Sequence, residues 1–229
     1  MIISHRHKFI FIKTNKTAGT SIEIALSRFC GDDDVITPIS RDDEMTRQSL
    51  GYAGPRNYLA SRSEYGVRDY ANLLRGKRKA RYYNHMPSRE VKALIGDEVW
   101  NSYFKFCFER NPFDRVISLY YWRNKTEPRP SMSAFLDSDV PLLLQRRGYD
   151  LYTIDGRVVM DRVCMFEDMD AELERVRVLL GLTEPLELPR AKTSSRKDKR
   201  GFRELLTERE MDTVRTLFSR EIALFGFEG

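Results

Sequence analysis

The sequence contains few cysteines and few histidines, and it has no long apolar run. Its three cysteines are far apart and odd in number, which fits neither a disulfide framework nor a zinc site and favours a reducing compartment. The apolar runs are much shorter than the roughly 18 residues that a membrane span needs. Near the N-terminus, basic residues precede only four consecutive apolar residues, which is not typical of a secretory signal. If these 229 residues are the whole protein, we expect it in the cytoplasm, with no membrane span.

The sequence also lacks a strong excess of charge of either sign. The 39 basic and 34 acidic residues leave a net charge of +5, which suits an anionic small ligand but is too small to indicate nucleic acid. A hydrophobic content of 41% and a charged content of 32% are typical of a globular protein. The length predicts a single domain over residues 1–229. Within it, residues 32–83 and 124–150 show the least regular patterns.

A strand, a tight loop and a helix can be predicted near the N-terminus. Residues 9–12 are all aromatic or β-branched, as expected for a strand buried on both faces. Apolar residues then recur at helical spacing from Ile22 to Phe29. Thr20 and Glu23 form a capping-box pattern, so the predicted helix begins at about Thr20.

A second unit of the same kind follows in the middle of the chain. Residues 103–108 predict a strand, Asn111 suits a helix N-cap and Pro112 suits the first helical position. A third strand is predicted at 161–166, and further helices follow it. Strands that alternate with helices predict an α/β fold with a central parallel sheet of four or five strands flanked by helices.

The first loop has the features of a phosphate-binding segment. Ligands of open parallel sheets bind beyond the carboxyl ends of the strands, where this loop lies. Gly19 allows close backbone approach, the helix start offers N–H groups, and Lys16 supplies a positive charge. The loop is not a Walker A motif, because the lysine precedes the glycine. Similar short segments also occur by chance in capped helices.

Arg110 and Ser118 follow the second strand. The guanidinium group of Arg110 matches a phosphate bidentately, and Ser118 lies a little over two helical turns away, where it could share the same anion. The alternatives are a salt bridge from Arg110 to Glu109 or Asp114 and a solvated helix position for Ser118. Taken singly, each of these alternatives is favoured over the functional interpretation.

Taken together, the two units resemble the sulfotransferase family that uses 3′-phosphoadenosine 5′-phosphosulfate (PAPS), and most closely its carbohydrate-type branch. The resemblance covers most of the chain outside residues 32–80 and 124–150. Its motifs are Lys16-Thr17-Ala18-Gly19-Thr20-Ser21, Phe108-Glu109-Arg110-Asn111-Pro112 with Ser118, His85-Met86-Pro87, Phe166-Glu167-Asp168 and Phe225-Gly226-Phe227. Two residues depart from the family pattern. Asn15 replaces a proline, and Glu109 replaces an apolar residue. The carboxylate of Glu109 lies next to Arg110 in the sequence and could compete for the arginine's charge.

The resemblance implies a P-loop-like nucleotide-binding fold and a set of roles. The loop of residues 16–21 would hold the 5′-phosphosulfate, and Arg110 with Ser118 would hold the 3′-phosphate. Lys16 would neutralise charge on the departing phosphate, and His85 would be the base, unless it is only a structural histidine beside Pro87. Ser195 and Arg196 resemble a segment that covers the nucleotide, although a basic surface loop is an almost equal alternative.

The resemblance also implies partners. The donor is PAPS, no metal is required, and the acceptor is a hydroxyl group, which the carbohydrate-type likeness suggests is on a glycan or glycoconjugate. Nucleic acid is not expected as a partner, and no sequence feature assigns an oligomeric state.

Two other classes of function remain open at this stage. A kinase with an atypical phosphate loop would bind ATP with Mg²⁺, and Glu167 with Asp168 could be its metal-binding acids. A non-catalytic module that binds a glycan or another anion would use the basic run of residues 75–81, and its binding would weaken steeply with salt. That run is otherwise interpreted as a solvated surface.

Overall fold

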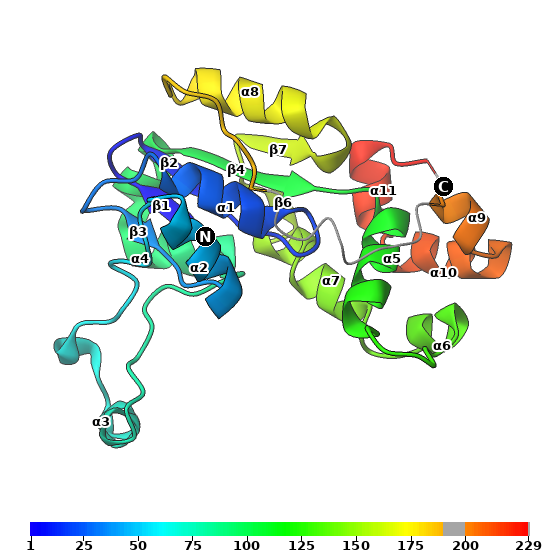
Figure 1. Ribbon diagram of the computed structural model, residues 1–229, viewed down its shortest axis with the longest axis horizontal. Coiled ribbons are helices and arrows are strands. Elements are labelled where there is room, and N and C mark those ends of the chain that lie inside the picture. The colour runs from blue at the N-terminus through cyan, green and yellow to red at the C-terminus, as the bar shows by residue number, and fades with distance from the viewer. Residues whose placement is uncertain (190–199, 229) are drawn as a thin grey trace.

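The computed structural model describes residues 1–189 and 200–228 (Figure 1). Its strands are short, and the longest coincides, to within one residue at each end, with the strand predicted at 103–108. They are β1 (Ile2–Ser4), β2 (Phe9–Phe11), β3 (Val35–Ile36), β4 (Phe104–Glu109), β5 (Thr153–Ile154), β6 (Arg157–Val158) and β7 (Arg162–Met165). The main sheet has the order β3-β1-β2-β4-β7, and β5 and β6 form a separate hairpin.

Helices connect and surround these strands, so the expected α/β class is confirmed. They are α1 (Gly19–Ser27), α2 (Arg41–Ser49), α3 (Val67–Leu74), α4 (Ser88–Ser102), α5 (Pro112–Arg123), α6 (Met132–Leu136), α7 (Leu142–Arg146), α8 (Met169–Leu179), α9 (Phe202–Leu205), α10 (Glu208–Leu217) and α11 (Ser219–Phe225). Across the described ranges, no helix combines the length and the apolar character that crossing a bilayer requires.

The main sheet is mixed rather than wholly parallel. β2, β4 and β7 run parallel, as the strand–helix order predicts. β1 pairs antiparallel with both β2 and β3. The physical reason is the connection, because β1 returns as β2 through a four-residue turn, and a parallel neighbour would need a crossover of a dozen or more residues.

Side chains of β2 alternate between the two faces of the sheet, as the period of a strand requires. Phe9 and Phe11 belong to an apolar cluster that includes residues of α1 and α8. Ile10 and Ile12 belong to the cluster on the other face, which includes residues of α4. The wholly apolar run therefore reflects a strand covered on both sides.

A third apolar cluster surrounds α5. Its members come from α5, α6, α7, α10 and the segments between them. These helices lie together at one end of the molecule (Figure 1). Because α5 begins just after β4, this cluster fixes the helix start at the carboxyl edge of the sheet.

Helix ends test the sequence predictions in detail. The side chain of Asn111 caps α5 by accepting from the backbone N–H of Phe113 at 3.0 Å, with Pro112 at the first position, as predicted. The predicted start of α1, at about Thr20, is confirmed to within one residue, but the predicted capping box is wrong. The helix begins at Gly19 with Ala18 as N-cap, and no capping box forms at Thr20 because the carboxylate of Glu23 pairs with Lys13 instead.

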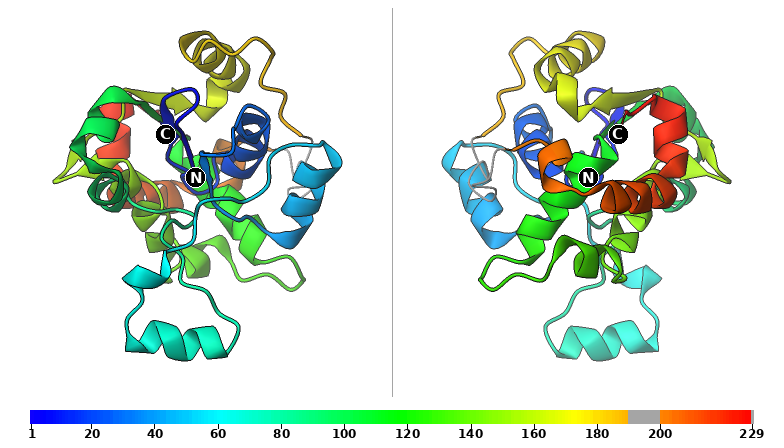
Figure 2. Two further views of the ribbon diagram at one scale, coloured as in Figure 1. Left: turned by 90° about the vertical axis from the view of Figure 1, so that its left-hand side faces the viewer. Right: turned by 90° about the vertical axis from the view of Figure 1, so that its right-hand side faces the viewer.

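Residues 57–81 leave the body as a long hairpin that carries α3 at its tip, and we call this segment the arm. Figures 1 and 2 show α3 well separated from the rest of the molecule. Backbone hydrogen bonds close its base, from Ala60 to the carbonyl of Lys79 at 3.0 Å and from Arg81 to that of Tyr58 at 2.8 Å. The arm occupies most of the second half of the segment in which the sequence showed little regular pattern.

Candidate functional site

The loop between β2 and α1 has an unusual backbone. Lys16 and Ala18 both adopt left-handed φ angles, of 66° and 59°, and helix α1 begins immediately afterwards. No side chain of the described residues caps this helix, and its first turn contains no acidic residue. The N–H groups of the first turn therefore offer their partial positive charge at the carboxyl end of β2. This is the backbone arrangement that favours an anionic group.

Gly19 is required by close approach rather than by its φ angle. A Cβ atom at this position would lie 2.8 Å from Cγ of Lys13 and 3.3 Å from the carbonyl oxygen of Thr14. The buried Lys13 side chain continues past the helix start to the carboxylate of Glu23, at 2.8 Å. Lys13 is thus held within the body, in contrast to Lys16, which is partly exposed.

Two threonines fasten the loop internally. The hydroxyl of Thr14 donates to the carbonyl of Phe108, at the end of β4, and lies 2.9 Å from the hydroxyl of Thr17. Thr17 is fully buried. Its hydroxyl therefore contributes to the loop's own structure, and a ligand could be bound only by its backbone N–H.

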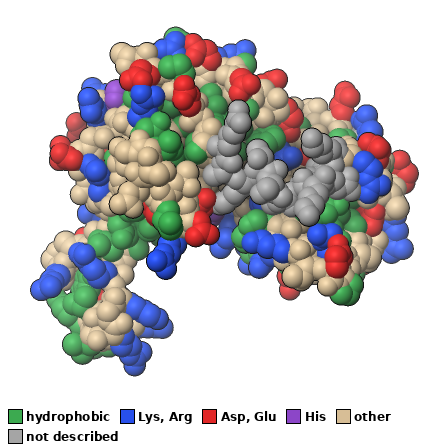
Figure 3. Space-filling view, viewed as in Figure 1, with side chains coloured by type: hydrophobic (Ala, Val, Ile, Leu, Met, Phe, Trp, Pro, Cys, Tyr) green, Lys and Arg blue, Asp and Glu red, His purple; other side chains and the backbone are tan. Residues whose placement is uncertain are grey.

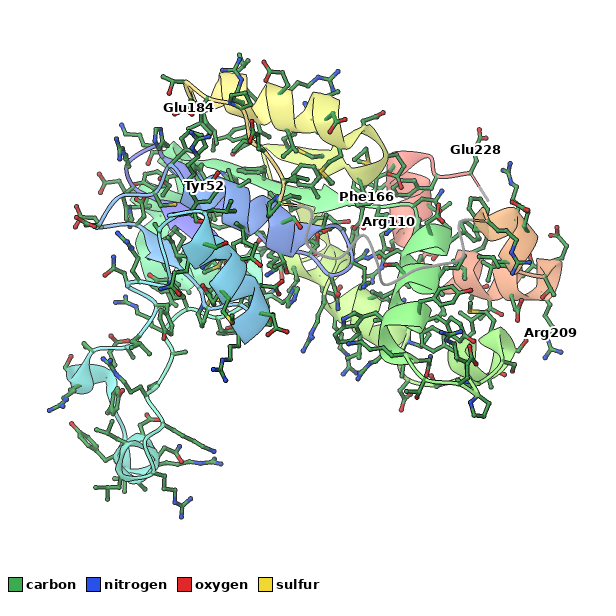
Figure 4. The ribbon with its side chains drawn as sticks, viewed as in Figure 1. Tyr52, Arg110, Phe166, Glu184, Arg209 and Glu228 are labelled. Atoms are coloured by element: carbon green, nitrogen blue, oxygen red, sulfur yellow. The ribbon has the colours of Figure 1, made fainter. Side chains whose placement is uncertain are left out.

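Arg110 joins the two strand–helix junctions. Its guanidinium group donates to the carbonyl of Lys16 at 3.4 Å, and it stacks on the ring of Phe166 with 4.2 Å between Cζ and the ring centre (Figure 4). The ammonium group of Lys16 lies 5.4 Å from the ring centre of Trp122, which belongs to α5. Lys16 and Arg110, two of the three basic residues predicted for the donor site, are therefore brought together at one edge of the sheet.

A buried ion pair supports this edge from inside. The carboxylate of Glu109 turns inward, where it accepts from Arg115 at 2.6 Å and from the hydroxyl of Tyr152 at 2.8 Å. Arg115 also donates to the carbonyl of Asn15 at 2.9 Å, so it connects β4 to the phosphate loop. Glu109 thus forms its ion pair with Arg115. Its carboxylate therefore does not compete for the charge of Arg110.

The fit around Arg115 is tight. Its guanidinium group donates to the carbonyls of Leu144 and Arg147, both at 3.2 Å. A Cβ atom added at Gly148 would overlap this guanidinium group. The segment after α7 is therefore part of the support of the phosphate loop, although its sequence showed little regular pattern.

Ser118 lies on α5 two turns beyond Arg110 and is partly exposed. Trp122 is one turn further along the same helix, and residues four apart share a helix face. The predicted serine and the tryptophan that contacts Lys16 therefore lie on one side of α5.

His85 lies beside the phosphate loop. Its Nδ1 atom is 2.8 Å from the carbonyl oxygen of Lys13. A carbonyl can only accept, so Nδ1 carries the proton and Nε2 keeps a lone pair. Burial and the nearby charge of Lys13 lower the pKa of His85 to about 4, so the imidazole is neutral at pH 7. A neutral imidazole with an unprotonated Nε2 can act as a base.

Sequence reasoning missed the supporting roles of Lys13, Arg115 and Trp122. One signal was available for Arg115, which lies among the buried apolar residues of α5. Trp122 stands four residues after Ser118, which places it on the same helix face. For Lys13, the capping-box pattern obscures the signal, because it assigns the partner Glu23 to the helix start. Ser195 and Arg196, predicted to cover the nucleotide, lie outside the described residues.

The acidic pair after β7 has a structural contact. The carboxylate of Glu167 accepts from the backbone N–H of Asn111 at 2.8 Å, at the start of α5. Within residues 1–189 and 200–228, no three His, Cys, Asp or Glu side chains are grouped so that they could hold a metal ion.

Comparisons with known proteins agree with this geometry. A sequence model described as "Sulfotransferase family" matches residues 1–139, which include the phosphate loop, His85, Arg110 and Ser118. A relative from Archaeoglobus fulgidus, named only "Uncharacterized protein", is 29% identical over 108 residues, which are 45% of this chain and 88% of the relative. No solved structure matches. Since the family match covers more than half of the chain, this enzyme belongs to the sulfotransferase family.

Proposed function

We propose that the enzyme transfers the sulfuryl group of PAPS to a hydroxyl acceptor. The observation that carries the proposal is the contact between Arg110 and the carbonyl of Lys16, because it joins the two junctions that would hold the two ends of one nucleotide. The 5′-phosphosulfate would lie on the loop of residues 16–21. The 3′-phosphate would lie against Arg110 and Ser118.

The residues present fit a doubly phosphorylated nucleotide. The start of α1 offers backbone N–H groups with no acidic residue in its first turn. The one carboxylate next to Arg110 in sequence is neutralised by Arg115. Lys16, Arg110 and a helix N-terminus together are the complement of two phosphate groups.

The reaction requires little covalent work from the protein. The bond between sulfur and the bridging phosphate oxygen breaks, and a bond forms between sulfur and the acceptor oxygen. Lys16 would stabilise the charge that develops on the departing phosphate. The acceptor proton would go to Nε2 of His85, whose tautomer the carbonyl of Lys13 fixes.

We propose a glycan or glycoconjugate as the acceptor, and a single catalytic domain over residues 1–229. Support for the acceptor is the carbohydrate-type resemblance of the motifs. The residues that recognise it would come from segments 32–83 and 124–150, since the phosphate loop and the α5 junction are taken up by the donor. No metal has a role in this scheme.

The test is calorimetric titration of adenosine 3′,5′-bisphosphate, the nucleotide product, into the wild type and Arg110→Ala. We expect metal-independent binding to the wild type, with at least a tenfold loss in the variant, as expected for a charged hydrogen-bonding group. Arg209→Ala is a matched control, because Arg209 is an exposed arginine on α10. It should bind like the wild type.

Titration of ATP with and without Mg²⁺ distinguishes a sulfotransferase from a kinase. Magnesium-dependent ATP binding with indifference to the bisphosphate would replace the proposal by a kinase. Binding of sulfated oligosaccharide that falls steeply with salt, with no nucleotide binding and no turnover, would indicate a non-catalytic anion-binding module.

A further inference from the structure

The arm has an internal structure of its own. Lys79 crosses it, donating to Asp69 at 2.9 Å and to the carbonyl of Glu64 at 2.8 Å. The rings of Tyr65 and Tyr70 pack edge to face with 5.5 Å between their centres. These contacts hold α3 in place on the two backbone segments of the hairpin.

The outer side of α3 is apolar and exposed. Val67 is 91% exposed, Leu74 is 92% exposed and Tyr70 is 49% exposed. With Ala71, these residues follow the spacing i, i+3, i+4 and i+7, which puts them on one helix face. An isolated exposed apolar residue needs no explanation, but a whole helix face does.

Positive charge is concentrated on the same segment. The arm contains seven basic and two acidic residues, a net charge of +5, and the whole chain also has a net charge of +5. The other residues therefore balance, with 32 basic and 32 acidic. The two acids of the arm, Glu64 and Asp69, pair with Arg81 and Lys79. Of the arm's basic residues, five make no ion pair with the described part of the chain: Arg62, Arg68, Arg75, Lys77 and Arg78.

Charged and apolar groups adjoin each other on α3. Arg68 and Arg75 are seven residues apart, so they line one edge of the face formed by Val67, Ala71 and Leu74. Figure 3 shows apolar and basic side chains side by side over the projecting arm. The arm extends away from the body, so a flat surface can reach this face without meeting the rest of the protein (Figure 2).

We propose that the arm docks on the surface of a membrane that contains anionic phospholipids. The apolar face of α3 inserts at the level of the headgroups, and the free basic residues contact lipid phosphates. An amphipathic helix with basic residues beside its apolar face is the arrangement that binds in the plane of such an interface. Each basic residue near an anionic membrane contributes about a fivefold gain in affinity.

The charge distribution favours this surface over two other partners. A purely hydrophilic polyanion would neutralise the arginines but would leave Val67 and Leu74 in water. A second copy of the chain would present a body with no net charge to an arm of +5. An anionic bilayer satisfies both the apolar face and the charge.

The experiment measures sedimentation of the 229-residue protein with vesicles of phosphatidylcholine alone and of phosphatidylcholine with 30% phosphatidylglycerol. The test variant is Val67→Asp with Leu74→Asp. The control is Val178→Asp with Leu179→Asp, because these residues are also exposed and apolar but lie on α8. Circular dichroism and size-exclusion chromatography of each variant verify its fold and its oligomeric state.

We expect binding to the anionic vesicles, at least tenfold weaker binding to the neutral ones, and at least a tenfold loss in the arm variant but not in the α8 variant. Arg75→Glu with Arg78→Glu should also lose at least tenfold. Equal binding of both vesicle types, or an arm variant that binds like the wild type, would overturn the proposal. An arm-dependent dimer without vesicle binding would assign the face to a second copy. Tight binding of heparin or duplex DNA, undiminished in the Asp variant and without vesicle binding, would assign the arm to a polyanion.

Discussion

Two neighbouring residues, Glu109 and Arg110, show how closely the site depends on single side chains. The carboxylate points into the protein and binds Arg115, and the guanidinium group lies at the phosphate loop. A buried ion pair of this kind contributes little net stability when intact, but removing one partner leaves an uncompensated charge. The support of the loop therefore depends on both charges being present.

Glu109→Gln should destabilise the protein by about 3–5 kcal/mol, because Arg115 would keep its charge in a buried site. Urea unfolding followed by circular dichroism measures this loss. Glu98→Gln is the control, since Glu98 is exposed on α4. If both variants unfolded at the same urea concentration, the buried pair would not have the role inferred here.

His85 makes a second prediction at this scale, on pH dependence. Its pKa is lowered to about 4, so the neutral form persists well below pH 6.5. For the free enzyme, kcat/KM should therefore decline on the acid side with an apparent pKa of about 4. The same shift reduces stability as pH falls from 6.5 to 4, because the unfolded chain takes up the proton first.

Rates measured from pH 4 to pH 9, with circular dichroism at each pH, separate the two effects. His85→Gln should lower kcat/KM by about 10²-fold to 10⁴-fold and remove the acid limb. An acid limb near pH 6.5 that persists in this variant would place the base elsewhere.

At the scale of elements, the order of strand, loop and helix could be read from the sequence, but several contacts could not. β2 is a contiguous apolar run, β4 is apolar except for Lys105 and Glu109, a polar loop follows each, and both predicted strands are confirmed. β1 and β3 have three and two residues, which is too short for any period to appear. Their place in the sheet follows from pairing with β2, and local sequence does not contain that information.

The candidate site could be predicted only in part, for a related reason. Lys16 and Arg110 were found because each follows an apolar strand. The contact from Glu109 to Tyr152 spans 43 positions, and the carbonyl that holds His85 belongs to Lys13, 72 positions away. The left-handed backbone at Lys16, Ala18 and His85 also escaped prediction, since no residue type there demands it.

Gly19→Ala is the prediction that belongs to this scale. The new methyl group would press on the side chain of Lys13 beneath the start of α1, which should destabilise the protein by about 1–3 kcal/mol and weaken bisphosphate binding. Calorimetry and urea unfolding measure the two effects. Gly54→Ala is the control, because its Cβ would meet nothing within 4 Å. A Gly19→Ala protein that matched this control would show that the loop tolerates the displacement.

At the scale of the whole molecule, the arm is structurally separate from the catalytic body. Its contacts run within the hairpin and at its base. The three apolar clusters that form the core contain no residue between Ser61 and Arg81. We therefore expect the body to fold without it.

Replacement of residues 61–78 by Asn-Gly should close the hairpin at its base, because the backbone of Ala60 already bonds to that of Lys79. The thermal midpoint should change by less than about 3 °C, which corresponds to about 1 kcal/mol for a protein of this size. Bisphosphate affinity should be unchanged. A midpoint lowered by more than about 10 °C would mean that the arm stabilises the body.

The carbonyl of Lys13 holds His85, and the side chain of the same lysine passes beneath the start of α1. The proposed base and the phosphate loop are therefore linked through Lys13. A polyanionic donor bound to the loop would favour the protonated imidazole, and by reciprocity that proton would strengthen donor binding by the same factor. In the proposed mechanism the imidazole of the free enzyme is a weak base, with its pKa lowered to about 4, and a bound donor would raise its proton affinity. Lys13 would then influence both the order in which the substrates bind and the activation of the acceptor.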